Sequence, residues 1–326
     1  MRLKILLTLS SRNIRANGRY ENLSLTQIRK DKMNFLNFGS LNLDIVYSVP
    51  HIVSPGETIS STCMDIFPGG KGLNQSVALS RAGGAVFHAG MIGEDGMMLK
   101  NVCRENKINT DYIRIVKEKT GNALIQVADS GENSIVLFGG ANQANSKEFV
   151  DSVLANFDEG DVLLLQNEIN LVDYIIEKAA ERKIKIVLNP SPYNEKLKNC
   201  DFSKVDLFFV NEVEGNQITG KSVPDEILDV LEKKFPAASF VLTLGKNGSV
   251  FSDGKKRTSC GIYPMPVVDT TAAGDTFTGF FCYLYFNKLG NIKEILDTAT
   301  KASALAVSKK SAVPSIPTMA QVNALN

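Results

Sequence analysis

The feature that most constrains the fold is a regular alternation of short apolar runs with longer amphipathic stretches. The stretches Asn74–Arg81, Leu171–Arg182 and Pro224–Phe235 space their apolar residues with helical period. The runs have strand length and are mostly apolar, as expected of strands buried on both faces. They are Phe35–Phe38, Val86–Met91, Val162–Leu165, Ile184–Leu188, Leu207–Val210 and Phe240–Leu244. The alternation predicts an α/β fold with a mainly parallel central sheet and helices on both faces.

Two segments break this rhythm, at about residues 44–66 and 118–140. They alternate apolar with polar residues and contain the turn pairs Pro55-Gly56 and Ser130-Gly131. Half-exposed antiparallel strands have this pattern. We therefore predict a small sheet that stands off the main domain as a lid over a cleft. The alternative is an antiparallel edge of the main sheet.

The composition excludes several classes of protein. The 326 residues are 44% hydrophobic and 22% charged, enough for a sizeable core. A net charge of +1 gives no reason to expect a nucleic acid partner. The sequence contains no apolar run of about 18 residues, so it predicts no membrane span. Five dispersed cysteines without a CxxC pair suggest reduced thiols and a cytoplasmic location, and two histidines exclude a His-rich metal site.

Residues 1–32 differ from the rest, because they carry eight basic and two acidic side chains, against 28 basic and 33 acidic ones in the remainder. We predict a leader that is disordered or not native, with a true start at Met33 and a single large domain over residues 33–326. An organellar transit peptide and an ordered functional arm are the alternatives. The interrupted apolar stretch Leu3–Leu9 is too short for a secretory signal.

The segment Asp269-Thr-Thr-Ala-Ala-Gly-Asp275 precedes the apolar stretch Phe277–Phe286, which we expect to be a buried helix. The small residues Ala272, Ala273 and Gly274 leave backbone N–H groups uncovered at a helix N-terminus, where anions bind. Asp275 would then be either a capping acid or a general base beside an anion hole. The spacing alone leaves both open.

Two further segments carry polar residues where ligands bind. The turn Gly69-Gly-Lys-Gly-Leu-Asn74 brings backbone close to a ligand, with Lys71 and Asn74 as polar contacts, or is a plain turn with Asn74 as N-cap. Asn42 and Asp44 lie on one side of an extended chain, which suits adjacent sugar hydroxyls but also an ordinary strand end.

Together, Gly69-Gly-Lys-Gly-x-Asn74, Asn211-Glu-Val-Glu214 and Asp269-Thr-Thr-Ala-Ala-Gly-Asp275 resemble the ribokinase (PfkB-type carbohydrate kinase) family, in order and approximate spacing. The resemblance runs from about residue 34 to the C-terminus. It implies a ribokinase-like three-layer sandwich with a small β-sheet lid. Gly39-Ser-x-Asn-x-Asp44, Pro55-Gly-Glu-Thr58 and Asn74-Gln75 narrow it to the members that phosphorylate ribose.

The resemblance also implies roles for individual residues. Asp275 would take the proton from the sugar's 5-hydroxyl, and the backbone from Ala272 to Asp275 would hold the transferring phosphoryl group. Glu168 is otherwise best explained as a surface acid, but the resemblance makes it a sugar contact. The implied substrate-binding residues are Asn42, Asp44, Gly70, Lys71, Gly72, Asn74, Glu168 and Asp275.

For the nucleotide and the metals, the resemblance implies ATP, Mg²⁺ and K⁺. Glu214 would hold Mg²⁺ mainly through water. The nucleotide contacts would be Asn211, Thr243, Gly245, Lys246, Gly248, Gly274 and Thr300, where Thr300 replaces a usual Asn and 243–248 is also explained as a hairpin turn. The K⁺ positions would be Asp269, Thr271, Ala306, Lys309, Ser311 and Ser315, where Ser311 replaces a common Gly.

The leading prediction is ATP-dependent phosphorylation of D-ribose at the 5-hydroxyl, giving ribose 5-phosphate and ADP. The same family includes kinases of deoxyribose, fructose, fructose 1-phosphate, ketodeoxygluconate and nucleosides, which remain alternatives. A non-catalytic sugar-binding regulator is a further alternative, although Gly274 and Asp275 are intact. The expected partners are a small sugar and ATP, together with a second copy of the chain bound through the lid sheet.

Overall fold

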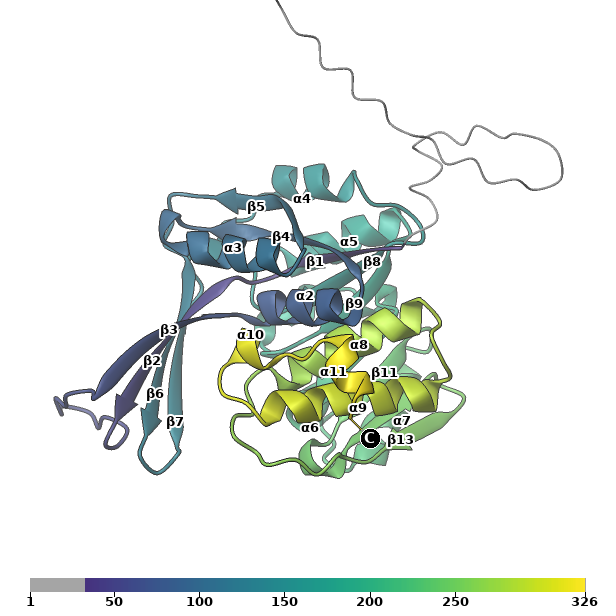
Figure 1. Ribbon diagram of the computed structural model, residues 1–326. Helices are drawn as coiled ribbons and strands as arrows, with labels where there is room; N and C mark the ends of the chain where they lie inside the picture. The colour runs from purple at the N-terminus through teal and green to yellow at the C-terminus, as the bar shows by residue number, and fades with distance from the viewer. Residues whose placement is uncertain (1–32, 326) are drawn as a thin grey trace, which may run out of the picture. The chain divides into compact units, whose positions relative to one another are not determined.

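The structure is a computed structural model, and it describes residues 33–325. Within this range the chain forms a nine-stranded sheet covered by helices and a separate four-stranded sheet, which Figure 1 shows beside it. The predicted leader, residues 1–32, lies outside the described residues, as does Asn326. No helix within 33–325 is long and apolar enough to cross a membrane.

The large sheet has the strand order β13-β12-β11-β10-β9-β8-β1-β4-β5. The seven strands from β11 to β5 are parallel to their neighbours, and β12 and β13 extend the sheet as an antiparallel edge. The bounds are β1 Asn34–Phe38, β4 Ala85–Ile92, β5 Asn109–Ile115, β8 Val162–Gln166, β9 Lys185–Asn189, β10 Leu207–Asn211, β11 Ser239–Thr243, β12 Ser249–Ser252 and β13 Arg257–Cys260.

Helices cover both faces of this sheet and divide the core in two. Successive residues of β8 show the division, because Val162 and Leu164 belong to one core and Leu163 and Leu165 to the other. The first core packs against α2 Lys71–Ala82, α3 Met97–Glu105, α8 Ala273–Phe286, α9 Ile292–Val307, α10 Ala312–Ser315 and α11 Met319–Asn323. The second packs against α4 Lys147–Leu154, α5 Val172–Glu181, α6 Glu212–Thr219 and α7 Pro224–Lys234. Figure 1 looks onto the face that carries α2, α8 and α9.

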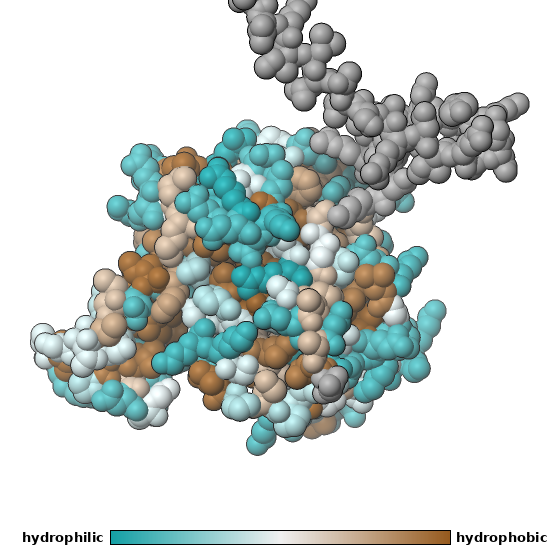
Figure 2. All heavy atoms as spheres, in the orientation of Figure 1, coloured by the Kyte–Doolittle hydropathy of each residue, from teal (hydrophilic) through white to brown (hydrophobic). Residues whose placement is uncertain are grey.

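The small sheet has the order β3-β2-β6-β7. Its strands are β2 Asn42–Val49, β3 Cys63–Gly69, β6 Gly121–Ala128 and β7 Asn133–Phe138. The register aligns Ile66, Ile45, Leu124 and Val136 across the four strands, so these apolar side chains share one face. Asn42 and Asp44 are on the opposite face. Figure 2 shows hydrophobic residues gathered over this sheet, where Ile66, Leu124 and Val136 are exposed.

The predicted fold class is confirmed. Each of the predicted apolar runs is a strand of the large sheet, and the predicted helices correspond to α2, α5, α7 and α8. The segments near 44–66 and 118–140 form a separate sheet, so the alternative of an edge to the main sheet is wrong. One detail of the lid was also wrong, because its central pair β2 and β6 is parallel. The periodicity missed β5 and β13, whose polar and exposed positions hide the apolar signal.

Candidate functional site

The residues singled out from the sequence gather at the carboxyl end of the parallel strands. Glu168 follows β8, Asn211 ends β10 and Thr243 ends β11, and Asn211 and Thr243 are register partners. The first turns of α2 and α8 supply Lys71, Asn74 and Asp275. Open α/β sheets bind their ligands at this edge, because loops of adjacent strands meet there.

Asp275 lies in the first turn of α8, but its hydrogen bonds are with α2. Its Oδ2 accepts from Asn74 Nδ2 at 3.0 Å, and its Oδ1 accepts from Gln75 Nε2 at 2.9 Å. The carboxylate is 8% exposed. No side-chain hydrogen bond caps α8, so Asp275 does not cap the helix by hydrogen bonding, although its position in the first turn still complements the helix dipole. The carboxylate is instead held in place by two amides and keeps lone pairs for a ligand.

One glycine and an aromatic cluster bring α8 to this position. A Cβ on Gly279 would lie 2.4 Å from the Cβ of Ala78, so α8 and α2 cross in close contact. Phe277 and Phe281 of α8 pack edge-to-face on Phe209 of β10, at ring distances of 6.4 and 5.4 Å. These contacts fix the N-terminal turn of α8 against both the sheet and α2.

The backbone before α8 leaves several N–H groups free. Within the described residues, the N–H groups of Ala272, Gly274 and Asp275 form no hydrogen bond, whereas that of Ala273 donates to Thr270 O at 3.3 Å. A Cβ on Gly274 would meet no atom within 4 Å, so the space in front of this turn is open. The predicted anion hole over 272–275 is therefore available to a ligand except at Ala273.

The glycine turn before α2 is shorter than predicted, because the helix begins within the segment predicted as a turn. Helix α2 begins at Lys71, and Gly70 is its N-cap with φ +93°, a conformation that favours glycine. The interpretation of Asn74 as N-cap is therefore wrong, because Asn74 lies one turn inside the helix. A Cβ on Gly72 would lie 2.4 Å from Ser40 N, so the loop after β1 packs directly on this turn.

Glu168 joins the two loops. Its Oε2 accepts from Ser40 Oγ and from Lys71 N, the latter at 3.0 Å, and Ser40 Oγ in turn accepts from Gly72 N at 3.1 Å. Burial is the main cause that raises the pKa of Glu168, opposed by the nearby charge of Lys71. The interpretation of Glu168 as an ordinary surface acid is wrong, since such an acid would be solvated.

Asn42 and Asp44 approach this site from the lid. Asn42 is 6% exposed, and its Oδ1 accepts from Asn142 Nδ2 at 2.7 Å. A Cβ on Gly69 would lie 2.0 Å from Asp44 Oδ2, so only glycine leaves room for this carboxylate. The two side chains share one lid face, as the sequence predicted, and Gly69 and Gly121 are the register partners of Asn42 in the sheet.

The charges at this site influence one another. The pKa of Asp44 is raised to about 7 by burial and, to a lesser extent, by the charges of Glu168 and Asp275. Burial opposes the charge on Lys71, but Asp275, Glu168 and Glu214 outweigh it and raise its pKa. Lys71 is thus a cation surrounded by carboxylates, and this set of hydrogen-bond donors and acceptors favours a hydroxyl-rich ligand.

The motif Asn211-Glu-Val-Glu214 forms a capping box on α6. Asn211 Oδ1 accepts from Val213 N and Glu214 N, and Glu214 Oε2 accepts from Asn211 N at 2.8 Å. Glu214 is only 6% exposed. No cluster of three or more metal-ligating side chains occurs in residues 33–325. This donor set suits a cation that keeps most of its water.

The hairpin predicted at residues 243–248 is present, since β11 and β12 are antiparallel neighbours. Gly245 and Gly248 both have positive φ, and a Cβ on Gly248 would lie 2.0 Å from Cys260 O. Lys246 lies in the turn between them, and no described residue forms an ion pair with it. Thr300 lies apart on α9, where its Oγ1 donates to Leu296 O at 2.7 Å, so its hydroxyl is engaged within its own helix.

The segment from Asp269 to Thr271 meets the loop after α9. Asp269 accepts from Thr271 N at 2.8 Å and from Ser311 N at 2.9 Å. Burial opposes the charge of Asp269, but these hydrogen bonds outweigh it and lower its pKa. Ser311 has φ +71°, and its buried Oγ has no partner among the described residues.

The remaining positions implied for a monovalent cation lie along the same loop. Lys309 N donates to Ala306 O at 3.2 Å, and Ser315 is fully buried in α10. A carboxylate with a low pKa beside an unpaired hydroxyl fits a weakly hydrated cation. The structure thus brings Asp269, Thr271 and Ser311 together directly, with Ala306, Lys309 and Ser315 in the adjoining turns.

Several residues of the site were missed from the sequence. Ser40 and Gln75 stand within the quoted motifs but had no assigned role, and Asn142 follows the glycine pair Gly139-Gly140 without having been considered. Ser303 of α9 donates to Ala273 O at 3.0 Å and holds the first residue of α8. Polar residues next to glycine turns are the signal that could have found the first three.

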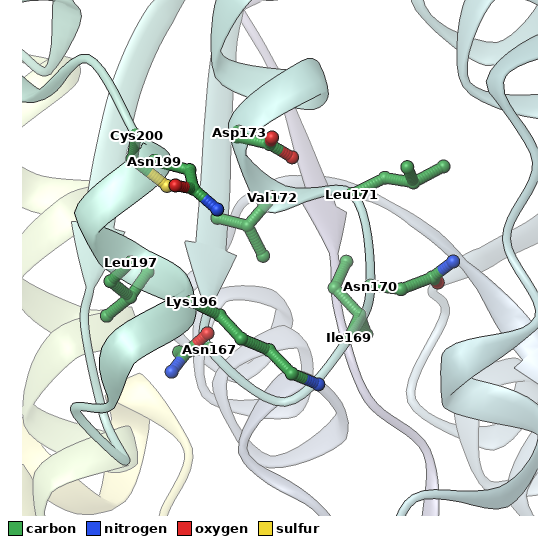
Figure 3. A pocket seen from close by; sticks show the side chains of 10 residues that line it. All are labelled: Asn167, Ile169, Asn170, Leu171, Val172, Asp173, Lys196, Leu197, Asn199 and Cys200. Atoms are coloured by element: carbon green, nitrogen blue, oxygen red, sulfur yellow. The ribbon is translucent and has the colours of Figure 1, made fainter.

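A cavity of about 240 Å³ lies between the start of α5 and the segment after β9. In Figure 3, Lys196 and Asn167 line one side, and Ile169 and Leu171 the other. None of the site residues described above lines it. Burial raises the pKa of the Cys200 thiol in its wall to about 12, which disfavours the thiolate near neutral pH.

Known proteins resemble this chain over almost its whole described length. The sequence profile of the pfkB family carbohydrate kinases matches residues 34–319. A ribokinase of Haemophilus influenzae is 39% identical over 295 residues, covering 86% of this chain and 94% of that protein. The crystal structure of ribokinase from Cryptococcus neoformans in complex with ADP has a TM-score of 0.77 at 33% identity, covering 90% of this chain and 99% of that one. Arabidopsis thaliana ribokinase complexed with ribose and ATP has a TM-score of 0.78 at 28% identity, covering 90% and 98%.

Proposed function

Because this chain belongs to the pfkB family of carbohydrate kinases, we propose that it transfers the γ-phosphoryl group of ATP to the 5-hydroxyl of D-ribose. The products are ribose 5-phosphate and ADP. The observation that carries the proposal is the Asp275 carboxylate, held by Asn74 and Gln75 beside the free N–H groups of Gly274 and its own backbone. A base and an anion hole side by side are what phosphoryl transfer to a hydroxyl needs.

In the proposed mechanism, the oxygen of the sugar hydroxyl attacks the γ-phosphorus while Asp275 accepts the proton of that hydroxyl. The bond from phosphorus to the bridging oxygen of ADP breaks on the opposite side. The N–H groups of Ala272, Gly274 and Asp275 donate to the phosphoryl oxygens, and the cation of Lys71 adds a positive charge close by. Fixed donors of this kind stabilise charge without having to reorganise.

The sugar lies between the lid and the first turn of α2 in this proposal. Asn42, Asp44 and Glu168 form hydrogen bonds with its ring hydroxyls. The other sugar contacts are Lys71, Asn74 and the backbone of Gly70 and Gly72. The buried, unpaired Oδ1 of Asn74 supports this role, because a buried acceptor favours a ligand hydroxyl. The anchoring of Asn42 by Asn142 fixes its orientation toward the sugar.

The nucleotide lies along the hairpin turn in the same proposal, with Asn211, Thr243, Gly245, Lys246 and Gly248 as contacts and Thr300 beside the base. Mg²⁺, when bound, neutralises charge on the phosphates, and Glu214 would hold it through water. K⁺, when bound, stabilises the loop before α8 electrostatically. Asp269, Thr271 and Ser311 would hold it with Ala306, Lys309 and Ser315.

The decisive experiment is ATP turnover with Mg²⁺ and K⁺ against a sugar panel. The panel contains ribose, deoxyribose, fructose, fructose 1-phosphate and adenosine, and Asp275→Asn is the control. Turnover with ribose that is lost in Asp275→Asn would support the proposal. Preference for another sugar would retain the mechanism and contradict the assignment of Asn42, Asp44 and Lys71. No turnover together with ribose binding by calorimetry would indicate a binding protein.

We also propose a homodimer formed through the outer lid face. Ile66, Leu124 and Val136 are 48, 39 and 63% exposed and lie in one row across the sheet, which is unusual for a face in contact with water. Leu124→Asp is expected to give a monomer by sedimentation velocity, whereas Val223→Asp, at an exposed apolar position outside the lid, leaves the dimer intact. A monomeric parent protein would contradict the proposal.

Five unpaired cysteines also support a cytoplasmic location.

A further inference from the structure

The carboxylate of Asp275 is connected to the centre of the large sheet by a chain of buried amides. Gln75 Nε2 donates to Asp275 Oδ1 at 2.9 Å, and Gln75 Oε1 accepts from Gln166 Nε2 at 2.6 Å. The same nitrogen of Gln166 donates to Asn37 Oδ1 at 3.2 Å, and Asn37 Nδ2 donates to Gly72 O at 2.8 Å. Gln75, Gln166 and Asn37 are all 0% exposed.

The NH₂ group of Gln166 determines which atoms donate and which accept along this series of hydrogen bonds. An amide NH₂ group has two hydrogens, and Gln166 donates one to Gln75 and the other to Asn37. Gln75 therefore presents its oxygen to Gln166 and its NH₂ group to Asp275. If the amide of Gln75 were reversed, its oxygen would face the carboxylate and its nitrogen would face the nitrogen of Gln166, so both contacts would repel.

The second amide on Asp275 is not anchored in this way. Asn74 Nδ2 donates to Oδ2, but Asn74 Oδ1 is buried without a partner among the described residues. Asn74 is thus free to respond to a ligand, whereas Gln75 is held from behind. Gln166 Oε1 is likewise buried without a partner among the described residues, but packing confines this amide, because a Cβ on Gly39 would lie 2.4 Å from Gln166 Oε1 and only glycine admits the amide there.

We propose that Gln75 and Gln166 are positioning residues for the phosphoryl transfer: Gln75 orients the Asp275 carboxylate toward the sugar hydroxyl, and Gln166 keeps Gln75 in its donor orientation. This rests on the proposed function, since it requires Asp275 to be the base. Both side chains are fully buried, so they act on the reaction through Asp275. Their contribution is to the geometry of the proton acceptor, where small displacements have large effects on rate.

The test is a double-mutant cycle on the full-length enzyme. Gln75→Met keeps the length of the side chain and removes the donor, so kcat is expected to fall about 10- to 100-fold with both KM values within about twofold. Gln166→Met is expected to lower kcat about three- to tenfold. The double variant is expected to match Gln75→Met within about twofold, because Gln166 acts only through Gln75.

Ser76→Ala is the matched control. Ser76 is the next residue of α2, equally buried, and its Oγ pairs with His88 Nδ1 at 2.8 Å, away from Asp275. It is expected to lower the melting temperature as much as Gln75→Met does, yet to keep kcat within about twofold. Gln75→Asn, one methylene too short to reach Oδ1, serves in place of Gln75→Met if that variant does not fold.

The outcomes separate the two proposals. A parent protein that phosphorylates no sugar of the panel would overturn both the proposed function and the positioning roles. If the parent is active and Gln75→Met keeps the parent kcat, with or without a higher KM, the positioning role alone is overturned. Effects of Gln75→Met and Gln166→Met that multiply in the double variant would overturn the link between these two residues.

Discussion

The two ends of the site are built from different parts of the chain. At the proposed sugar end, Asn42, Asn74 and Asp275 are buried side chains whose positions depend on other side chains. At the proposed nucleotide and cation end, glycines with positive φ form the surface, as at Gly245 and Gly248. The difference teaches that side-chain identity is critical at the first end and backbone conformation at the second. Substitutions should therefore have larger effects at the sugar end.

The largest effect is expected for Asp275→Asn, which keeps the size of the side chain and removes the proton acceptor. We expect kcat to fall about 10²- to 10⁴-fold, the usual contribution of a general base. Steady-state turnover of ATP with the preferred sugar measures this. Thermal unfolding is the control for folding, and retention of more than about a tenth of the parent kcat would contradict the role of Asp275.

Gly72→Ala and Gly245→Ala compare the two ends directly. The new Cβ at residue 72 would lie 2.4 Å from Ser40 N and 2.6 Å from Gly39 C, so the backbone must move. We expect a loss of about 1 to 3 kcal/mol in unfolding free energy and a large rise in KM for the sugar. Gly245 has φ +51° and no atom within 4 Å of the added Cβ, so a loss of about 1 kcal/mol and an unchanged sugar KM are expected. Equal losses in urea unfolding would remove the distinction between the ends.

Asp44→Asn tests the charge at the sugar end. Because the folded protein raises the pKa of this carboxyl from 3.8 to about 7, the folded state binds a proton more tightly than the unfolded state. Its stability contribution is thus fully present below about pH 4 and is lost as the pH rises through about 7. Because Asp44 is partly exposed, we expect the variant to gain only about 1 to 2 kcal/mol relative to the parent between about pH 5 and pH 8. If the difference in unfolding free energy between Asp44→Asn and the parent is the same at both pH values, the pKa of Asp44 is not raised.

The smallest effect is expected at the cation end, for Ser311→Gly. Serine at φ +71° and ψ +161° occupies a region that is otherwise almost confined to glycine. Removing this strain should stabilise the fold by about 1 kcal/mol, after allowance for the extra freedom of glycine in the unfolded chain. Differential scanning calorimetry with Ser308→Gly as comparison measures it, and a lower melting temperature would show that Ser311 is unstrained.

Much of the fold could be predicted from the sequence. The run Val162–Leu165 is apolar at every position because both faces of β8 are covered, and this alone indicates a central parallel strand. The polar strand β5 could not be found in this way, since its exposed edge position needs no apolar pattern. Likewise, the lid was recognised from its alternation, but the parallel pairing of β2 and β6 depends on partners 79 residues apart, as for Asn42 and Gly121.

For the candidate site the division is similar. Asp275, Lys71, Asn42 and Asp44 stand in motifs with glycine and could be chosen from the sequence. Gln166 could not, because it ends an apolar strand and its partners Gln75 and Asn37 lie 91 and 129 residues away. No local pattern records a contact of that range.

The sequence by itself determined the strand and helix pattern, the class of site and the side chains that can carry a proton or a charge. These depend on local spacing, glycine content and apolar periodicity, which act within about one turn or one strand. Only the tertiary structure decided which of these side chains meet. Asp275 faces α2 and not its own helix because the α2 and α8 backbones cross at Gly279 and Ala78. Packing of distant segments, and not the local chain, sets such distances.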